Sequence, residues 1–302
     1  MTGFKRFTYD ELKKATRNFS KEIGRGAGGI VYKAVLLDDR VAAVKVLSNA
    51  TTGEADFLAE ASTIGRVNHM NLIGMWGFCA EGKHRLLVTE FMEHGSLAQN
   101  LSSPELHWKR RFDIAVGTAK GLAYLHDECL EWVLHCDVKP QNILLDSHYQ
   151  PKVADFGLSK LMDRGKVMNS DFSRIRGTRG YIAPDWVSNL PITSKVDVYS
   201  FGIVMLEIVT GISPTTSVHS MESGRDVKHS QLVPWVRNKM KEAGRMGSRV
   251  EEMVDPALKG DYDLKKMEIL IDVALKCVEE DRNARPTMSQ VVEMLLRHEN
   301  DG

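Results

Sequence analysis

The sequence has few cysteines and no excess of charge of either sign. Its 302 residues include only 4 cysteines, and none of them forms a Cys-x-x-Cys pair. This spacing suggests neither a disulfide framework nor a zinc site, and a reducing compartment is expected. The 40 basic and 40 acidic residues cancel to a formal net charge of +0. Because nucleic-acid-binding proteins usually carry a basic excess, nucleic acid is not expected as the main partner.

The sequence also lacks a hydrophobic run long enough to cross a bilayer. The most apolar stretch lies between Phe201 and Ile212, and Glu207 interrupts it. A membrane-spanning helix needs about 20 apolar residues, so this stretch predicts a buried core helix. The first six residues contain no apolar region of the signal-peptide type.

The sequence instead shows a change of pattern along its length. Short β-type runs separated by turn residues dominate from residue 30 to residue 91, and helical spacing interrupts them at 54–66. Beyond Gly95, long helices are predicted at 111–126, 196–210, 266–279 and 288–297. A small β-rich part is therefore expected before a larger helical part, with a hinge near residues 93–95.

A short helix is predicted before the first strand. Thr8 and Glu11 have the spacing of a capping box, in which each side chain bonds the other residue's backbone N–H. Leu12, Ala15 and Phe19 follow at near-helical spacing. This lead-in helix is expected to dock on the residues that come after it.

A glycine-rich loop follows, with the pattern G-x-G-x-x-G-x-V formed by Gly24, Gly26, Gly29 and Val31. Glycines let a loop approach phosphates closely, because no Cβ stands in the way. Dinucleotide-binding folds share the spacing, but there a helix follows the loop. Here a strand-like run follows, which favours a nucleotide flap over an oxidoreductase.

Lys45 lies in the next apolar strand, where a buried amine is costly without an anion. Glu60, in the following helical stretch, is the expected partner, and such a pair directs the ammonium toward the phosphates of ATP. The alternative for either residue alone is a solvated side chain.

The densest signal is His135-Cys136-Asp137-Val138-Lys139-Pro140-Gln141-Asn142, followed by Asp155-Phe156-Gly157. Phosphoryl transfer needs an oriented hydroxyl, a neutralised triphosphate and bound magnesium. Asp137 is the candidate acceptor of the hydroxyl proton, and Lys139 would stabilise charge on the transferred group. Asn142 and Asp155 offer oxygen ligands to Mg²⁺. The alternative for the two aspartates is turn formation.

These ordered motifs resemble those of the eukaryotic protein kinases, from Phe7 to about Arg297, and within them the plant receptor-like kinases. The lead-in from Phe7 to Phe19 looks like the juxtamembrane region of that group. The segments 69–79 and 177–184 look closest to its S-domain, lectin-like branch. The resemblance implies an α+β, bilobal protein kinase fold. Its N-lobe would be a small antiparallel β-rich lobe with one regulatory helix, and its C-lobe larger and mainly helical.

On this resemblance, residues 1–20 form a juxtamembrane lead-in, 21–92 the N-lobe and 93–302 the C-lobe. The implied activity is that of a serine/threonine protein kinase that phosphorylates proteins, itself included. Lys139 and the Gly-Thr at Thr178 resemble the serine/threonine rather than the tyrosine enzymes. The implied ATP-binding residues are Gly24, Gly26, Gly29, Val31, Ala43, Lys45, Thr89, Glu90, Met92 and Leu144.

The implied cofactors are ATP and Mg²⁺, with Mn²⁺ as an alternative ion, and the implied partners are ATP and protein substrates. The candidate phosphorylation sites are Ser170, Ser173 and Thr178. The full-length protein is expected to add transmembrane and extracellular parts, with this chain as a soluble domain at the cytoplasmic side of the plasma membrane.

Two positions depart from the family pattern. Cys136 replaces the arginine that binds an activation-loop phosphate in many kinases, so a weak dependence on such phosphorylation is expected. Asp185 replaces a glutamate that pairs with an arginine, here Arg285, and the shorter side chain predicts reduced stability.

A pseudokinase of the same fold is the main rival, but it usually lacks the lysine or one aspartate, and Lys45, Asp137 and Asp155 are all present.

Overall fold

A computed structural model divides the chain into two compact units, Met1–His94 and Gly95–Gly302. The residues that it describes are 4–26, 28–48, 57–58, 61–62, 64–129, 132–155, 160–162, 177–187, 191–215, 232–242, 246–258 and 260–297.

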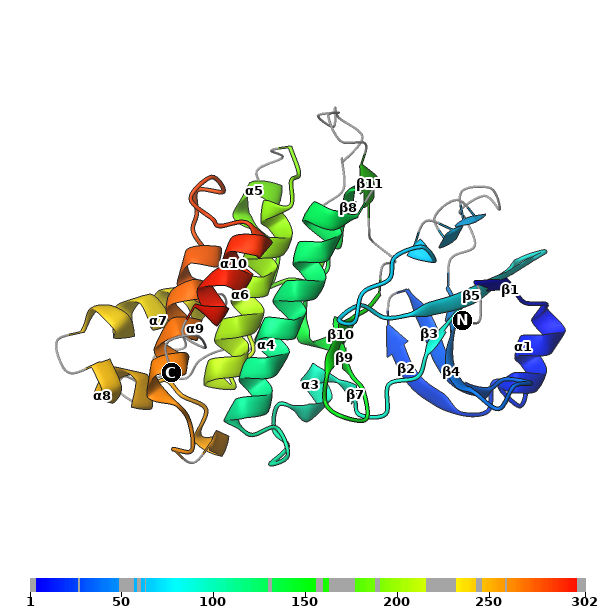
Figure 1. The fold of residues 1–302 in the computed structure, drawn as a ribbon, viewed down its shortest axis with the longest axis horizontal. Helices are drawn as coiled ribbons and strands as arrows, with labels where there is room; N and C mark the ends of the chain where they lie inside the picture. The colour runs from blue at the N-terminus through cyan, green and yellow to red at the C-terminus, as the bar shows by residue number, and fades with distance from the viewer. Residues whose placement is uncertain are drawn as a thin grey trace. The chain divides into compact units, whose positions relative to one another are not determined.

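The N-terminal unit is built on a six-stranded sheet with the strand order β1-β5-β6-β4-β3-β2 (Figure 1). Its strands are β1 (Lys5–Arg6), β2 (Glu22–Gly26), β3 (Gly29–Val35), β4 (Val41–Leu47), β5 (Met75–Glu81) and β6 (His84–Glu90). Neighbouring strands are antiparallel except β1, which runs parallel to β5. The sheet is therefore mixed rather than purely antiparallel, because the lead-in segment adds a short strand beside β5.

Buried and partly buried residues alternate along the strands, so the two faces of this sheet differ. In β4, Ala42 and Val44 are fully buried, whereas Ala43 and Lys45 are only partly buried. The buried face forms a core cluster with residues of the lead-in: Phe7, Leu12, Ala34, Leu36, Ala42, Val44, Cys79, Leu86 and Val88. The other face carries Lys45 together with Val31 and Ala43, which are only partly buried.

Helix α1 (Tyr9–Ala15) contributes Leu12 to that core cluster, with no exposed surface. Its capping box is present as predicted: Thr8 Oγ1 accepts from Glu11 N at 3.1 Å, and Thr8 N donates to Glu11 Oε2 at 2.7 Å. The lead-in helix thus docks on the residues that follow it, as expected.

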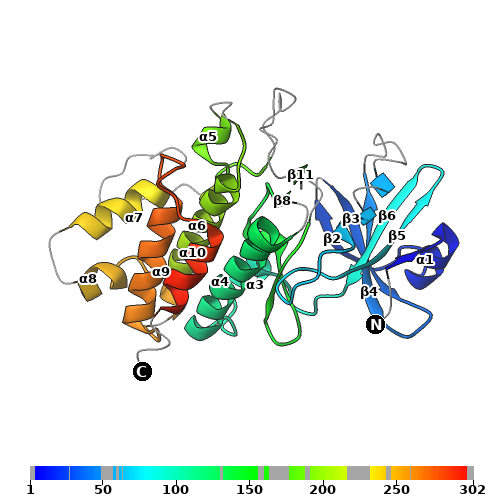
Figure 2. The same ribbon diagram turned by 45° about the horizontal axis from the view of Figure 1, so that its top comes forward.

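The C-terminal unit is mainly helical. Helices α4 (Trp108–Ala123), α6 (Lys195–Thr210), α9 (Leu264–Cys277) and α10 (Met288–Leu296) match the four predicted long helices within a few residues. They lie side by side and form the core of this unit (Figures 1 and 2). The remaining helices are α3 (Leu97–Asn100), α5 (Pro184–Val187), α7 (Leu232–Lys241) and α8 (Met246–Glu251).

The apolar stretch that begins at Phe201 lies in α6, as a buried core helix. Phe201 and Met205 have no exposed surface, and Glu207 is 6% exposed. The helix ends before Gly211, whose φ of 68° is left-handed, a conformation in which glycine avoids a Cβ clash.

Short strands hold the loops between these helices. Strands β7 (Gly95–Ser96), β9 (Ile143–Leu145) and β10 (Pro151–Val153) form one small sheet. Strands β8 (Trp132–Leu134) and β11 (Lys160–Met162) form another. The segment His135–Asn142 therefore runs between two fixed strands, β8 and β9.

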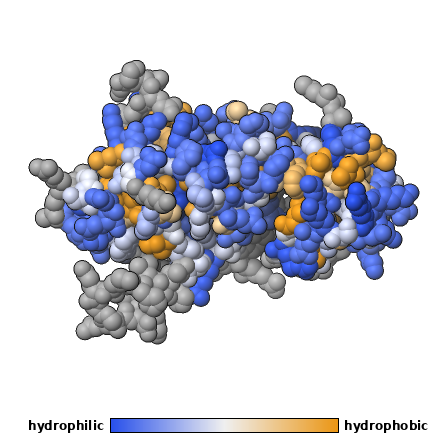
Figure 3. Space-filling view, turned by 90° about the horizontal axis from the view of Figure 1, so that it is seen from below, coloured by the Kyte–Doolittle hydropathy of each residue, from blue (hydrophilic) through white to orange (hydrophobic). Residues whose placement is uncertain are grey.

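In the described part of the chain, no helix has the length and apolarity needed to cross a membrane. The described residues on the face drawn in Figure 3 are mostly hydrophilic, and hydrophobic side chains gather there in smaller groups. The α+β fold class is as expected.

Candidate active site

The segment after β8 is held by a buried carboxylate of helix α6. Asp197 has no exposed surface, and it accepts from His135 N at 2.9 Å and from Cys136 N at 2.8 Å. Cys136 has a φ of 66°, a costly value for a non-glycine residue. The two bonds to Asp197 oppose that cost and fix the backbone just before Asp137.

Asp197 is also bonded to a histidine of the preceding helical segment. His126 Nε2 lies 2.9 Å from Asp197 Oδ2, and both side chains are buried. Burial raises the pKa of Asp197, but His126 and the backbone donors outweigh it and hold the pKa below its usual value. A charged carboxylate is thereby kept beneath the loop.

Asp137, Lys139 and Thr178 form a closed group of short hydrogen bonds. Lys139 Nζ donates to Asp137 Oδ2 at 2.6 Å and to Thr178 Oγ1 at 2.7 Å. Thr178 Oγ1 donates in turn to Asp137 Oδ1 at 2.7 Å. The Asp137 side chain is 10% exposed and that of Lys139 19%. The predicted proton acceptor and the predicted cation thus lie together, and a residue 41 positions away orients both.

Asn142 joins this group from the short helix before β9. Its Nδ2 donates to Asp137 O at 2.9 Å and to Asp137 Oδ2 at 3.2 Å. Because the amide nitrogen makes both bonds, the amide oxygen is the atom that Asn142 offers to a cation. Ala154 N donates to Asn142 O at 2.8 Å, which brings the backbone of the next residue, Asp155, close to Asn142.

These oxygen donors fit magnesium. Mg²⁺ takes one or two protein ligands and fills its other positions with phosphate oxygens and water. Among the described residues, no group of three or more histidine, cysteine or acidic side chains is placed to hold a metal ion. Asn142 and Asp155 would hold the ion only together with a bound nucleotide.

His135 is buried and fully hydrogen-bonded. Its Nε2 lies 2.8 Å from Ala154 O, and its Nδ1 accepts from Asp137 N at 3.2 Å. Since a carbonyl only accepts, Nε2 carries the proton. His135 therefore has a structural role, in which it joins the two loop segments.

The residues that pack around Cys136 could not be predicted from its motif. Its side chain is 4% exposed and packs in an apolar cluster that includes Trp186 of α5. The other buried members are Leu134, Ala183, Ile192 and Val196. The backbone next to Asp137 is therefore joined to α5 by apolar contacts at the position where many kinases have an arginine.

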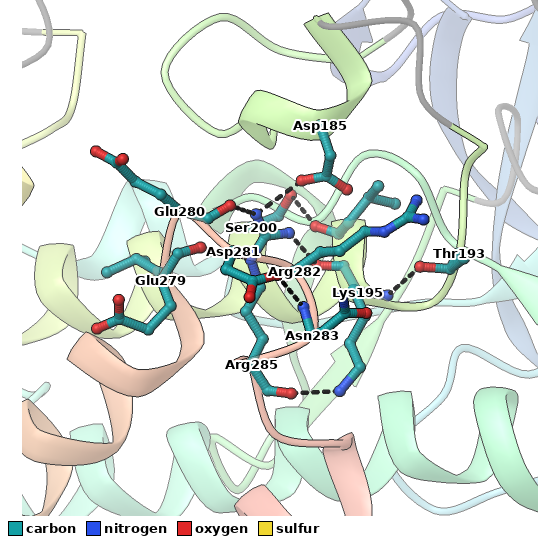
Figure 4. A network of polar contacts seen from close by, with 12 residues as sticks. Asp185, Thr193, Lys195, Ser200, Glu279, Glu280, Asp281, Arg282, Asn283 and Arg285 are labelled. Carbon is teal, nitrogen blue, oxygen red and sulfur yellow. Dashed lines mark hydrogen bonds and ion pairs between the residues drawn. The ribbon is translucent and has the colours of Figure 1, made fainter.

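The predicted pair of Asp185 and Arg285 is present and buried (Figure 4). Arg285 Nη2 lies 2.7 Å from Asp185 Oδ1, and their side chains are 0% and 4% exposed. Arg285 also donates to the carbonyls of Lys195, Glu279 and Glu280. However, neither oxygen of Asp185 accepts a hydrogen bond with good geometry. The pair is thus an ion pair with poor alignment, as a side chain one methylene too short would produce.

In the N-terminal unit, four predicted nucleotide-binding residues share the partly buried face of the sheet. Val31 is paired with Lys45, and Ala43 with Thr89. Directly paired residues, and residues two apart in one strand, point to the same face. A Cβ built on Gly28 would lie 3.0 Å from Lys45 Nζ, so the ammonium lies beside the glycine-rich loop.

The glycines of this loop lie in two antiparallel strands. Gly24 and Gly26 are in β2, and Gly29 begins β3. Gly29 has a φ of 144°, and a Cβ there would lie 2.1 Å from Val46 O. Only glycine fits at this close approach between β3 and β4.

Glu90, Met92 and Leu144 complete the predicted ATP-binding set. Glu90 N donates to Gly74 O at 3.0 Å, and Glu90 O accepts from Thr89 Oγ1 at 3.2 Å. Met92 is 8% exposed, and Leu144 is a partly buried residue of β9. Glu60, Ser170 and Ser173 lie outside the described residues.

The C-terminal unit also contains a buried pair that was not predicted from the sequence. Tyr181 Oη donates to Glu207 Oε2 at 2.6 Å, and Ser200 Oγ donates to Tyr181 O at 2.7 Å. Burial raises the pKa of Glu207 to about 7, against a lowering by Tyr181. The only sequence signal was an acidic residue inside an apolar helix, which requires a buried partner.

Comparison with known proteins agrees with this geometry. The family model described as "Protein kinase domain" matches residues 17–296. The maize (Zea mays) receptor protein kinase ZmPK1 is 53% identical over 300 residues, which are 98% of this chain and 36% of that protein. A G-type lectin S-receptor-like serine/threonine-protein kinase of Arabidopsis thaliana is 45% identical over 305 residues, 96% of this chain and 34% of that protein.

The rice (Oryza sativa subsp. indica) relative LECRK3, of the same description, is 42% identical over 297 residues, 96% of this chain and 35% of that protein. The chain therefore spans about a third of the length of the curated relatives that it matches. With the kinase motifs in place and this identity along nearly its whole length, the chain belongs to the protein kinase family, as a kinase domain of the plant S-receptor-like serine/threonine-protein kinase group.

Proposed function

We propose that this chain transfers the γ-phosphoryl group of ATP to serine and threonine hydroxyls of proteins, copies of itself included. The observation that carries the proposal is the group formed by Asp137, Lys139 and Thr178, with hydrogen bonds of 2.6–2.7 Å. It places a carboxylate, a cation and a hydroxyl at one point, which suits a reaction that depends on positioning and charge stabilisation.

In this proposal Asp137 accepts the proton of the substrate hydroxyl. The hydroxyl oxygen forms a bond to the γ-phosphorus, and the bond between that phosphorus and the leaving ADP oxygen breaks. Lys139 balances negative charge on the transferred group, and Thr178 holds the carboxylate in the orientation needed to take the proton. Mg²⁺, held by Asn142 and Asp155 with the nucleotide, would neutralise the triphosphate. Mn²⁺ could take its place at these hard oxygen ligands.

The nucleotide itself would be bound by the residues assigned from the resemblance. Gly24, Gly26 and Gly29 would cover the phosphates, and Lys45, paired with Glu60, would contact the α- and β-phosphates. The adenine ring would lie among Val31, Ala43, Thr89, Glu90, Met92 and Leu144. The proposal is supported by the shared sheet face of Val31, Ala43, Lys45 and Thr89.

Within a longer receptor, residues 1–20 would be the lead-in from the membrane, 21–92 the N-lobe and 93–302 the C-lobe. The relatives are named as receptor kinases and are about three times as long as this chain. We therefore place the chain at the inner face of the plasma membrane, as the signalling domain of a protein with transmembrane and extracellular parts. Its partners there are ATP and protein substrates.

The test is Mg²⁺-dependent autophosphorylation with labelled ATP, comparing the wild type with Asp137→Asn and Lys45→Met. We expect phosphoserine and phosphothreonine on the wild type and none on either variant. Binding of ATP by a wild type that incorporates no label would contradict the proposal and favour a pseudokinase.

A further inference from the structure

The lead-in segment (residues 1–20) is joined to the N-terminal sheet by backbone pairing. Strand β1 pairs with β5 through Lys5↔Gly77 and Arg6↔Phe78, and Phe7 N donates to Phe78 O at 2.8 Å. A Cβ on Gly77 would lie 1.9 Å from Lys5 O. The two backbones can therefore meet here only because position 77 has no side chain.

Side chains secure the same segment to the hairpin of β5 and β6. Arg6 Nη2 donates to Ala80 O at 2.7 Å, and Tyr9 N donates to Glu81 Oε2 at 2.9 Å. The ring of Tyr9 stacks on His84 with centroids 3.8 Å apart. Backbone pairing, side-chain hydrogen bonds and an aromatic stack thus fix residues 5–9 in one position along β5.

Phe4, at the start of this segment, is thereby placed against a second element. Its ring centroid lies 5.4 Å from that of Phe78, and the Phe78 centroid lies 6.1 Å from that of Phe57. A Cβ built on Gly65 would lie 2.4 Å from Phe4 Cε2. Phe4 therefore fills the space between β5 and Gly65.

Gly65 ends a helical stretch that includes the described residues 57–58, 61–62 and 64. Gly65 N donates to Ala61 O at 2.9 Å, which closes its last turn. Phe57 and Ala61 bury their side chains in a cluster with Phe78 and Ala80. Phe78 thus packs against both the helical stretch and Phe4.

We propose that Phe4 is a positioning residue for phosphoryl transfer, because it holds this helical stretch against β5. The inference rests on the proposed function, in which the stretch supplies Glu60 to Lys45. Without Phe4, Phe78 and Gly65 lose a packing partner and the helix can shift along the sheet. A side chain outside the family's matched range of 17–296 would then set how well Lys45 is directed toward ATP.

The variant that tests the inference is Phe4→Ala, with Phe4→Tyr as the conservative replacement. The matched control is Leu12→Ala in the same lead-in, since Leu12 packs in the core cluster on the other face of the sheet, away from Phe57 and Ala61. Phe4 is 37% exposed and Leu12 is 0% exposed, so the control is expected to lower Tm more than the test variant.

The measurements are Tm and the steady-state constants for ATP, taken well below every Tm. We expect Phe4→Ala to lower kcat/KM for ATP on the order of tenfold, and Phe4→Tyr to restore it. Leu12→Ala should keep kcat/KM within about twofold of the wild type despite its lower Tm. Wild-type kcat/KM in Phe4→Ala, or an equal loss in Leu12→Ala, would overturn the inference.

A second measurement separates this inference from the proposed function. Hydrogen exchange at the Gly65 amide should quicken in Phe4→Ala and stay unchanged in Leu12→Ala. This result is expected even if the wild type shows no turnover, an outcome that would refute the proposed function instead. Unchanged exchange at Gly65 in Phe4→Ala would refute the positioning role.

Discussion

At the scale of single residues, the proposed chemistry depends on how the carboxylate of Asp137 is held. Asp137 accepts from Thr178 on one oxygen and from Lys139 and Asn142 on the other. A carboxylate with both oxygens engaged has little rotational freedom, so it is oriented before any substrate arrives. Of its three partners, Thr178 is the one whose hydroxyl can be removed without changing a charge or a proposed metal ligand.

We therefore expect Thr178→Val to lower kcat by about 10- to 100-fold, because the isosteric side chain cannot orient Asp137. Thr178→Ser should keep most of the activity, since the hydroxyl remains. Steady-state kinetics with a protein substrate measure both values. Wild-type kcat in the valine variant would contradict this role of the hydroxyl.

The buried Glu207 predicts a pH-dependent stability. Burial raises its pKa from 4.5 to about 7 in the folded chain. The folded state therefore retains the proton, and the stabilisation is complete below pH 4.5 and is lost as the pH rises through about 7. The contribution that disappears over this range is on the order of 3 kcal/mol.

The measurement is the free energy of unfolding against pH for the wild type and Glu207→Gln. The glutamine variant cannot ionise, so the wild type should lose more stability than the variant between pH 4.5 and 7. Parallel curves for the two proteins would show that Glu207 does not titrate in this range.

At the scale of elements, helix α5 is attached to the C-terminal unit by Asp185 and Arg285. Their contact of 2.7 Å is an ion pair, yet the Asp185 oxygens accept no well-aligned hydrogen bond. A longer side chain can bring its carboxylate into line with the guanidinium, and buried pairs gain most from good geometry. We expect Asp185→Glu to raise the free energy of unfolding by about 1 kcal/mol.

The change is measured as a rise in Tm, with Asp185→Asn as the control. Asparagine leaves the buried Arg285 without its counter-charge, so the control should lower the free energy of unfolding by about 3–5 kcal/mol. An unchanged Tm in Asp185→Glu would show that alignment does not limit this pair.

The contact between α5 and Cys136 leads to a prediction about phosphorylation between Asp155 and Thr178. Apolar packing of Cys136, Ala183 and Trp186 joins α5 to the backbone just before Asp137, and Cys136 cannot pair with a phosphate as an arginine would. We therefore expect Ser170→Ala/Ser173→Ala to keep autophosphorylation within about threefold of the wild type. Thr178 is left intact in this variant because its hydroxyl contacts Asp137.

The control is phosphatase-treated wild type, whose autophosphorylation should proceed at its full rate from the start of the assay, without a lag. Loss of activity in the double variant, in a chain that still melts cooperatively, would contradict phosphate-independent attachment.

The long helices could be predicted because their apolar residues recur at helical spacing and are buried, as in α6 and α9. Strand β1 could not be predicted, since Lys5 and Arg6 are both charged and exposed. Its pairing depends on backbone groups and on the absence of a side chain at Gly77, which no periodicity reveals. For the same reason the mixed character of the sheet was not predicted.

The candidate site likewise contains residues whose proximity the sequence predicts and others whose proximity it does not. Asp137, Lys139 and Asn142 are close in sequence, so their spacing alone predicts a shared site. Thr178 was assigned as a phosphorylation site, and its contact with Asp137 across 41 positions is a result of tertiary folding. Spacing could not predict the pairing of Tyr181 and Glu207 either, because it depends on how the segment before α5 packs on α6.

At the scale of the whole molecule, the two units carry different halves of the proposed reaction. The N-terminal unit contains the glycine-rich loop and Lys45, and the C-terminal unit contains Asp137 and the proposed magnesium ligands. Neither unit alone contains both groups of residues. We therefore expect turnover to require the intact chain, with the proposed chemical step at Asp137.

The most direct test is transfer between two copies of the chain. A small amount of tagged wild type is mixed with an excess of Asp137→Asn chain, labelled ATP and Mg²⁺. We expect phosphoserine and phosphothreonine on the Asp137→Asn copy only when the wild type is present. Equal labelling of the Asp137→Asn chain by itself, or no labelling of either copy, would contradict Asp137 as the catalytic residue of an active kinase.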